Sequence, residues 1–90
     1  RAVTLTQLAD LVALADARSF TRAADVAGVA QPTLSRQLRV LEDELGAPLV
    51  QRGGREGVTL TPAGEVVLPL ARRMLADAER ARTGVAELIG

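Results

Sequence analysis

The chain has 90 residues, 48% of them hydrophobic, and no formal net charge, which suits one small globular domain with a thin core. The lack of cysteine and histidine excludes disulfides, the common zinc sites and imidazole catalysis. No apolar run approaches the ~20 residues that span a membrane, and no nucleophile–base pair or phosphate loop is present. We therefore expect no enzyme activity, no cofactor, no metal and no membrane partner.

The first two predicted helices are short. Thr4 or Thr6 can cap a helix that runs to about Ala17, because apolar residues follow at three- and four-residue spacing: Leu5, Leu8, Leu11, Val12 and Ala15. Ser19 can cap a second helix that Gly28 ends, and its inward-facing residues are expected to be Phe20, Ala23, Ala24 and Ala27.

The third predicted helix begins near Gln31 and Pro32, since proline is tolerated in a first turn, and Gly46 closes it. One narrow apolar stripe on this helix is expected in the core: Leu34, Leu38, Leu41 and Leu45. The helical period of about 100° per residue turns Pro32, Arg36, Arg39 and Asp43 away from that stripe, with Ser35 at its flank.

A hairpin is predicted after the third helix. The β-prone runs 49–52 and 58–60 flank the glycine-rich segment 53–57, so Arg52 and Arg55 lie on the hairpin. Thr61 followed by Pro62 then favours a helix start.

The last predicted helix is long, from Pro62 to about Ile89, with Pro69 expected to bend it. Apolar residues alternate at spacings of four and three and form a heptad seam: Val67, Ala71, Met74, Ala78, Ala81, Val85 and Leu88. The seam suits dimerisation. The alternative is a helix packed on its own domain, but at 1.5 Å rise per residue about 28 residues outreach a three-helix body.

These elements predict a mainly α fold: a winged helix-turn-helix of three helices and a two-stranded β wing, followed by a long linker helix. Within the turn, Ala24 lets the third helix pack across the second, Gly28 suits a left-handed residue, and Val29 and Leu34 fill the angle. Taken alone, this Ala–Gly–Leu spacing is a weak signal for DNA binding.

The surrounding residues resemble the LysR-type family of bacterial transcription regulators over nearly the whole chain. The matching motifs are residues 19–24 (SFTRAA), 31–38 (QPTLSRQL), 41–46 (LEDELG), 49–52 (LVQR) and 60–64 (LTPAG). Two residues depart from the family pattern: Ala30 stands where serine often caps the recognition helix, and Val50 replaces the usual phenylalanine.

The resemblance implies a DNA-binding domain at residues 1–61 and a linker/dimerisation helix at residues 62–90, truncated before an effector domain that binds a small-molecule inducer. In the major groove, Gln31 is expected at a base such as adenine, and Pro32 and Thr33 at a thymine methyl group. Arg36 is expected either at guanine or at a phosphate. Residues expected at phosphates or in the minor groove are Thr21, Arg22, Ser35, Arg39, Arg52 and Arg55.

The expected partners are double-stranded DNA with an interrupted palindromic operator and further copies of the chain, in a homodimer or a higher homo-oligomer, in the cytoplasm at the nucleoid. Between residues 18 and 55 there are six arginines and four acidic residues, so a basic face is compatible with zero net charge. Zero net charge also leaves open a different class of function, a helical dimerisation or adaptor module without DNA binding.

Overall fold

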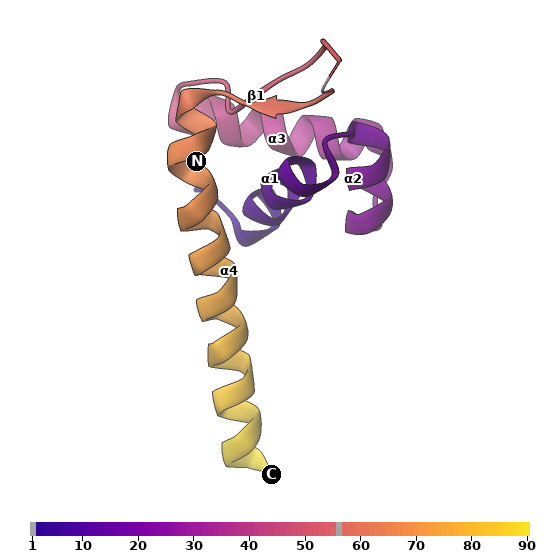
Figure 1. Ribbon diagram of the computed structural model, residues 1–90. Coiled ribbons are helices and arrows are strands. Elements are labelled where there is room, and N and C mark those ends of the chain that lie inside the picture. The colour runs from indigo at the N-terminus through magenta and orange to yellow at the C-terminus, as the bar shows by residue number, and fades with distance from the viewer. Residues whose placement is uncertain (1, 56) are drawn as a thin grey trace.

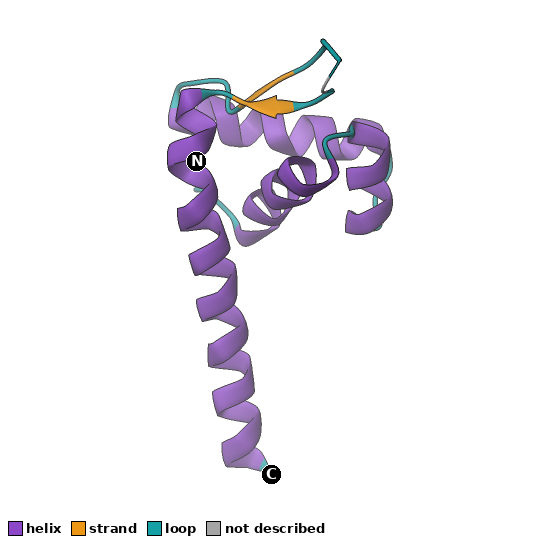
Figure 2. Ribbon diagram, in the orientation of Figure 1, coloured by secondary structure: helices purple, strands orange, loops and turns teal. Residues whose placement is uncertain are grey.

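A computed structural model describes residues 2–55 and 57–90, with four helices and a two-stranded sheet. In chain order the elements are α1 (Leu5–Ala17), α2 (Phe20–Ala27), α3 (Gln31–Leu45), β1 (Val50–Gln51), β2 (Thr59–Leu60) and α4 (Pro62–Ile89). Three helices and the hairpin form a body from which α4 projects (Figures 1 and 2), giving principal extents of 49 × 26 × 22 Å. The predicted fold class is confirmed.

Local capping explains where α1 and α2 begin and end. Of the two candidate caps, Thr4 is the one used: its side chain accepts from the Gln7 N–H, and Gln7 reciprocates. Ser19 caps α2 by accepting from the Arg22 N–H, as predicted. Gly28 ends α2 at φ 73°, a left-handed conformation that glycine adopts without steric cost.

The turn after Gly28 leads into α3 at Gln31, with Pro32 in the first turn. Ala30 is the N-cap residue and supplies no side-chain hydrogen bond, which confirms the weak cap expected from the sequence. Leu34 is fully buried and Val29 packs against the core, so both fill the angle between α2 and α3 as predicted.

One core joins all three helices of the body to the base of α4. Its buried apolar residues are Leu8, Leu11, Leu14, Phe20, Ala23, Ala24, Leu34, Leu38, Leu41, Leu49, Val58 and Ala71. Two expectations about this core are wrong. Ala27 is exposed because it lies in the last turn of α2, and Leu45 is 44% exposed because α3 extends past the body at its C-terminal end.

The wing is an antiparallel pair that is shorter than the predicted hairpin. Val50 pairs with Leu60 and Gln51 with Thr59. The Glu42 carboxylate accepts from the Leu49 N–H at 2.7 Å and fixes the start of β1 on α3. Two-residue strands are marginal alone, so the wing depends on this contact and on its packing against the body.

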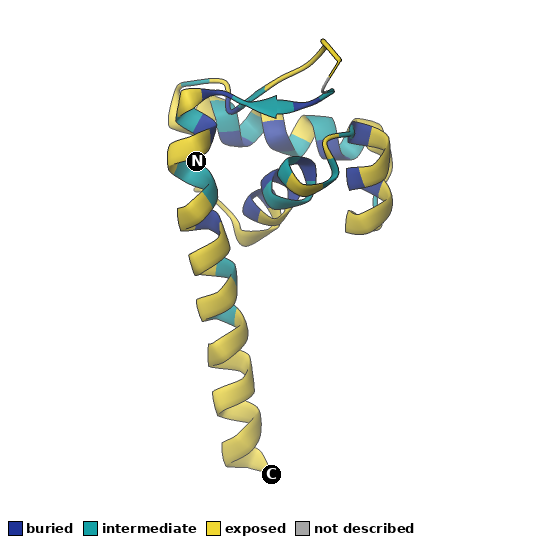
Figure 3. Cartoon of the chain, in the orientation of Figure 1, coloured by how far each residue is buried: buried dark blue, intermediate teal, exposed yellow. Residues whose placement is uncertain are grey.

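The first turns of α4 belong to the core, and the rest of the helix does not. Thr61 caps α4 by accepting from the Gly64 N–H, and its hydroxyl donates to the Pro48 carbonyl at 2.7 Å. Gly64 lies so close to the Leu49 carbonyl that a Cβ there would collide with it. The helix continues without a break through Pro69, and all its residues from 79 onward are exposed (Figure 3).

Candidate nucleic-acid interface

The N-terminal half of α3 and the wing extend to the same side of the molecule, away from the free end of α4 (Figure 1). On α3, Gln31, Pro32, Arg36 and Arg39 are exposed, while Thr33 and Ser35 are half-buried. The face turned away from the leucine stripe is therefore available to a partner, as the helical period predicted.

Gln31 is held by a side chain of the preceding helix. The Thr21 hydroxyl, in the first turn of α2, donates to Gln31 Oε1 at 3.3 Å, and both side chains are exposed. Arg22 is exposed beside Thr21, but its backbone N–H is taken by the Ser19 cap. Fewer free N–H groups than expected therefore remain at this helix start for a phosphate.

The side chain of Arg52 lies over the body of the domain. Its guanidinium carbon lies 3.9 Å from the centroid of the Phe20 ring, and Nη2 donates to Ser35 Oγ at 3.4 Å. A cation prefers the electron-rich face of an aromatic ring, which explains why Arg52 lies over Phe20. The sequence did not reveal this role for Phe20, because the two residues are 32 positions apart (52 − 20).

Arg55 lies at the exposed tip of the wing, next to two glycines with positive φ, Gly53 at 102° and Gly54 at 76°. These conformations favour glycine and let the chain turn within a narrow loop. A narrow loop with a terminal arginine has the shape and charge for a DNA minor groove.

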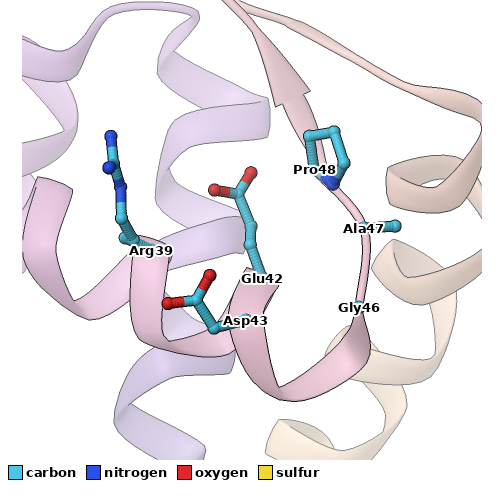
Figure 4. A pocket seen from close by; sticks show the side chains of 6 residues that line it. All are labelled: Arg39, Glu42, Asp43, Gly46, Ala47 and Pro48. Atoms are coloured by element: carbon cyan, nitrogen blue, oxygen red, sulfur yellow. The ribbon is translucent and has the colours of Figure 1, made fainter.

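Within residues 2–55 and 57–90, no carboxylate pairs with Arg22, Arg36, Arg39, Arg52 or Arg55. On α3, Glu42 and Asp43 lie within about one turn of Arg39 and line a hollow with it, although neither pairs with it. Figure 4 shows the Glu42 carboxylate turned toward the segment that carries Pro48, and Asp43 turned away from it. Arg22, Arg36, Arg52 and Arg55 thus lie at the start of α2, in the N-terminal half of α3 and on the wing, while Arg39 lies beside the acidic residues of α3.

A hollow lies between α3 and the wing, and Ser35, Arg39 and Arg52 line it together with Phe20 and Glu42. Glu42 Oε2 accepts from the Leu49 N–H, and Arg52 Nη2 donates to Ser35 Oγ. The remaining guanidinium donors of Arg39 and Arg52 suit a phosphate, whereas the negative charge of Glu42 in the same hollow opposes it.

The residues of the predicted dimer seam on α4 differ in exposure along the helix. Ala71 is fully buried in the domain's own core and Val67 packs against that core, so neither is free for a partner. Beyond them, Ala78 is half-buried, and Met74, Ala81, Val85 and Leu88 are exposed. The exposed apolar residues near the base of α4 are instead Val66 at 67% and Leu70 at 52%.

The predicted seam did not include Val66 and Leu70, because the sequence alone does not distinguish an apolar stripe through these two residues from the heptad through Val67 and Ala71. The missed signal is the continuation of the free stripe: Val66, Leu70 and Met74 are spaced by four and project from one face of α4. The described residues include no group of acidic side chains that could hold a metal ion, and no helix among them is long and apolar enough to cross a membrane.

Three helices with an exposed, arginine-bearing third helix, a two-stranded wing beside it and a projecting helix define the winged helix-turn-helix class. The family model for bacterial regulatory helix-turn-helix proteins of the lysR family matches residues 5–65. The chain belongs to this LysR family, as its motifs indicated.

Relatives and solved structures agree with this assignment. The SDS degradation transcriptional activation protein of Pseudomonas sp. (strain ATCC 19151) is 47% identical over 85 residues, covering 93% of this chain and 27% of that protein. The BenM DNA-binding domain in complex with catB site 1 DNA superposes with a TM-score of 0.91 at 36% identity, covering 98% of each chain. Corynebacterium glutamicum OxyR gives a TM-score of 0.94 at 38% identity, covering all of this chain and 29% of that one. The chain thus spans about a quarter of the curated relatives it matches.

Proposed function

We propose that this chain binds double-stranded DNA sequence-specifically, as the DNA-binding part of a LysR-type transcription regulator. The observation that carries the proposal is the single basic face formed by α3, the start of α2 and the wing, whose arginines have no carboxylate partner within the described parts of the chain. The solved BenM domain, which is similar over 98% of both chains, is a DNA complex.

In this proposal α3 enters the major groove and the wing follows the minor groove. Gln31 and Arg36 contact base edges, and Pro32 and Thr33 lie against thymine methyl groups. The phosphate contacts are assigned to the backbone N–H of Thr21 and to Arg22, Ser35, Arg39 and Arg52, with Arg55 in the minor groove. The hollow of Ser35, Arg39 and Arg52 receives the DNA backbone that runs between helix and wing.

We infer that two copies associate through α4. The stripe of Val66, Leu70, Met74, Val85 and Leu88 exposes large apolar side chains that the small body does not cover. Two recognition helices per dimer then require an interrupted palindrome, whose half-sites lie one helical turn of DNA apart or a multiple of it.

We also propose a division of labour along the chain. Residues 1–61 bind DNA and residues 62–90 link and dimerise, although the first turns of α4 also complete the core. The longer relatives contain further sequence that this chain does not match, and we assign binding of a small-molecule inducer to a domain outside this chain. The chain acts by binding rather than catalysis, in the cytoplasm at the nucleoid.

A fluorescence-anisotropy titration with a labelled random-sequence duplex at low salt tests the proposal against a helical dimerisation module without DNA binding. We expect binding whose logarithm falls linearly with the logarithm of salt concentration. The matched control is the variant Arg22→Ala/Arg39→Ala/Arg55→Ala, which leaves the α4 stripe intact and should lose most of this binding. Equal anisotropy for both proteins, or no binding by either, contradicts the proposed function.

A further inference from the structure

Thr21 and Gln31 come from different helices and meet at the start of the recognition helix. Thr21 lies in the first turn of α2, which the Ser19 cap fixes, and Gln31 is the first residue of α3. The two helices are set against each other by the left-handed Gly28 and the Val29 N–H bond to the Ala24 carbonyl. The 3.3 Å distance between Thr21 Oγ1 and Gln31 Oε1 therefore follows from the turn itself.

The direction of this hydrogen bond is determined by its atoms. A carboxamide oxygen only accepts, whereas a threonine hydroxyl has one hydrogen to donate, so Thr21 is the donor. The bond holds Oε1 toward α2. The two N–H donors of the same carboxamide, which branch from the other side of its carbon, then point away from Thr21.

We propose that Thr21 is a specificity-determining residue, because it makes Gln31 present hydrogen-bond donors rather than its oxygen to the base that it contacts. The inference rests on the proposed DNA binding. Adenine offers one acceptor and one donor in the major groove, so a bidentate glutamine contact needs the carboxamide oxygen at the base edge. Guanine offers two acceptors, N7 and O6, and needs donors alone. Gln31 held by Thr21 therefore selects guanine over adenine at its base position.

Selection from a duplex library with a randomised central segment, using the whole chain, supplies the probe. Anisotropy titrations then give the ratio of guanine to adenine affinity at each position of the selected duplex, for the native chain, Thr21→Val and Thr21→Ser. Valine keeps the shape and removes the hydroxyl, while serine keeps the hydroxyl. At the position where Gln31→Ala abolishes discrimination, we expect the native chain and Thr21→Ser to prefer guanine. Thr21→Val should shift the ratio toward adenine by on the order of tenfold.

The remaining outcomes separate this inference from the proposed function. An unchanged ratio in Thr21→Val, or an equal loss of affinity on every duplex, makes Thr21 a phosphate contact only and overturns the inference. A native preference for adenine also overturns it. Thr21→Val should leave the ratio unaltered when Gln31→Ala is already present, and any change there contradicts the mechanism. If no variant and no native chain binds duplex DNA, the proposed function itself fails.

Discussion

Asp10 is a carboxylic acid inside the core, and the structure gives it little to bind. It lies on α1 with 3% of its surface exposed, and its Oδ2 has no hydrogen-bond partner among the described residues. Burial raises the pKa of Asp10 from 3.8 to about 6, because the charged form loses its hydration. Folding at neutral pH therefore proceeds against the cost of burying this charge.

The sign and size of the effect follow from proton linkage. Because the folded pKa exceeds the unfolded value, the contribution of Asp10 to the free energy of unfolding is highest below pH 3.8 and falls as the pH rises toward about 6. At 1.36 kcal/mol per pKa unit, the rise of about two units corresponds to about 3 kcal/mol at neutral pH. Asparagine has nearly the same shape as aspartate but cannot ionise. The variant Asp10→Asn therefore does not lose this stability as the pH rises.

The assay compares urea unfolding of the native chain and Asp10→Asn at pH 4 and pH 7, at one protein concentration because dimerisation contributes to stability. Far-UV circular dichroism is the readout, since the chain has no tryptophan or tyrosine. The stability of Asp10→Asn relative to the native chain should increase by about 2.4 kcal/mol from pH 4 to pH 7, because a small part of the loss has already occurred at pH 4. A difference that stays constant between the two pH values refutes the reasoning, because the other carboxyl groups are common to both proteins.

Three further predictions concern α4 and the wing. Leu70→Asp should shift sedimentation equilibrium toward monomer without lowering monomer stability, whereas Val67→Asp should unfold the domain, and the reverse pattern contradicts the assigned faces. Gly64→Ala should lower the free energy of unfolding by on the order of 3 kcal/mol or more, since its Cβ meets a backbone carbonyl, whereas Gly84→Ala meets nothing and should raise it by about 0.5–1 kcal/mol in urea titrations. Arg52→Ala should weaken binding to every duplex and reduce the slope of log affinity against log salt concentration by about one unit, whereas Arg52→Lys should keep that slope. Equal slopes for Arg52→Ala and the native chain exclude a phosphate contact by Arg52.

Local patterns predicted most of the fold. The caps at Ser19 and Thr61, the left-handed Gly28 and the proline in the first turn of α3 are short-range features, and each is confirmed. The two wrong predictions of burial concern residues at helix ends that the neighbouring elements do not cover. The three- and four-residue period places Ala27 and Leu45 on the inner face correctly, but it does not tell where the body stops covering that face.

The candidate site was predictable in its residue types but less so in its geometry. Helical periodicity predicted that Gln31, Arg36 and Arg39 are exposed, and the structure confirms it. The position of Arg52 depends on Phe20, a residue of another element, and no spacing in the chain encodes that contact. Likewise, the heptad through Val67 and Ala71 is present in the sequence, but both residues pack in the core of the body, and the exposed apolar residues at this level of α4 are Val66 and Leu70.

The most direct test of the account is to measure how Gln31→Ala and Arg55→Ala bind the selected duplex and a scrambled one across a salt series. Gln31→Ala should lose on the order of 1–3 kcal/mol on the selected duplex and little on the scrambled one. Arg55→Ala should lose the same factor on both duplexes and lower the salt slope, because its contact is electrostatic rather than base-specific. If the two variants lose equal factors on both duplexes, the central claim is wrong. That claim is that α3 reads the base sequence and the wing anchors the DNA backbone.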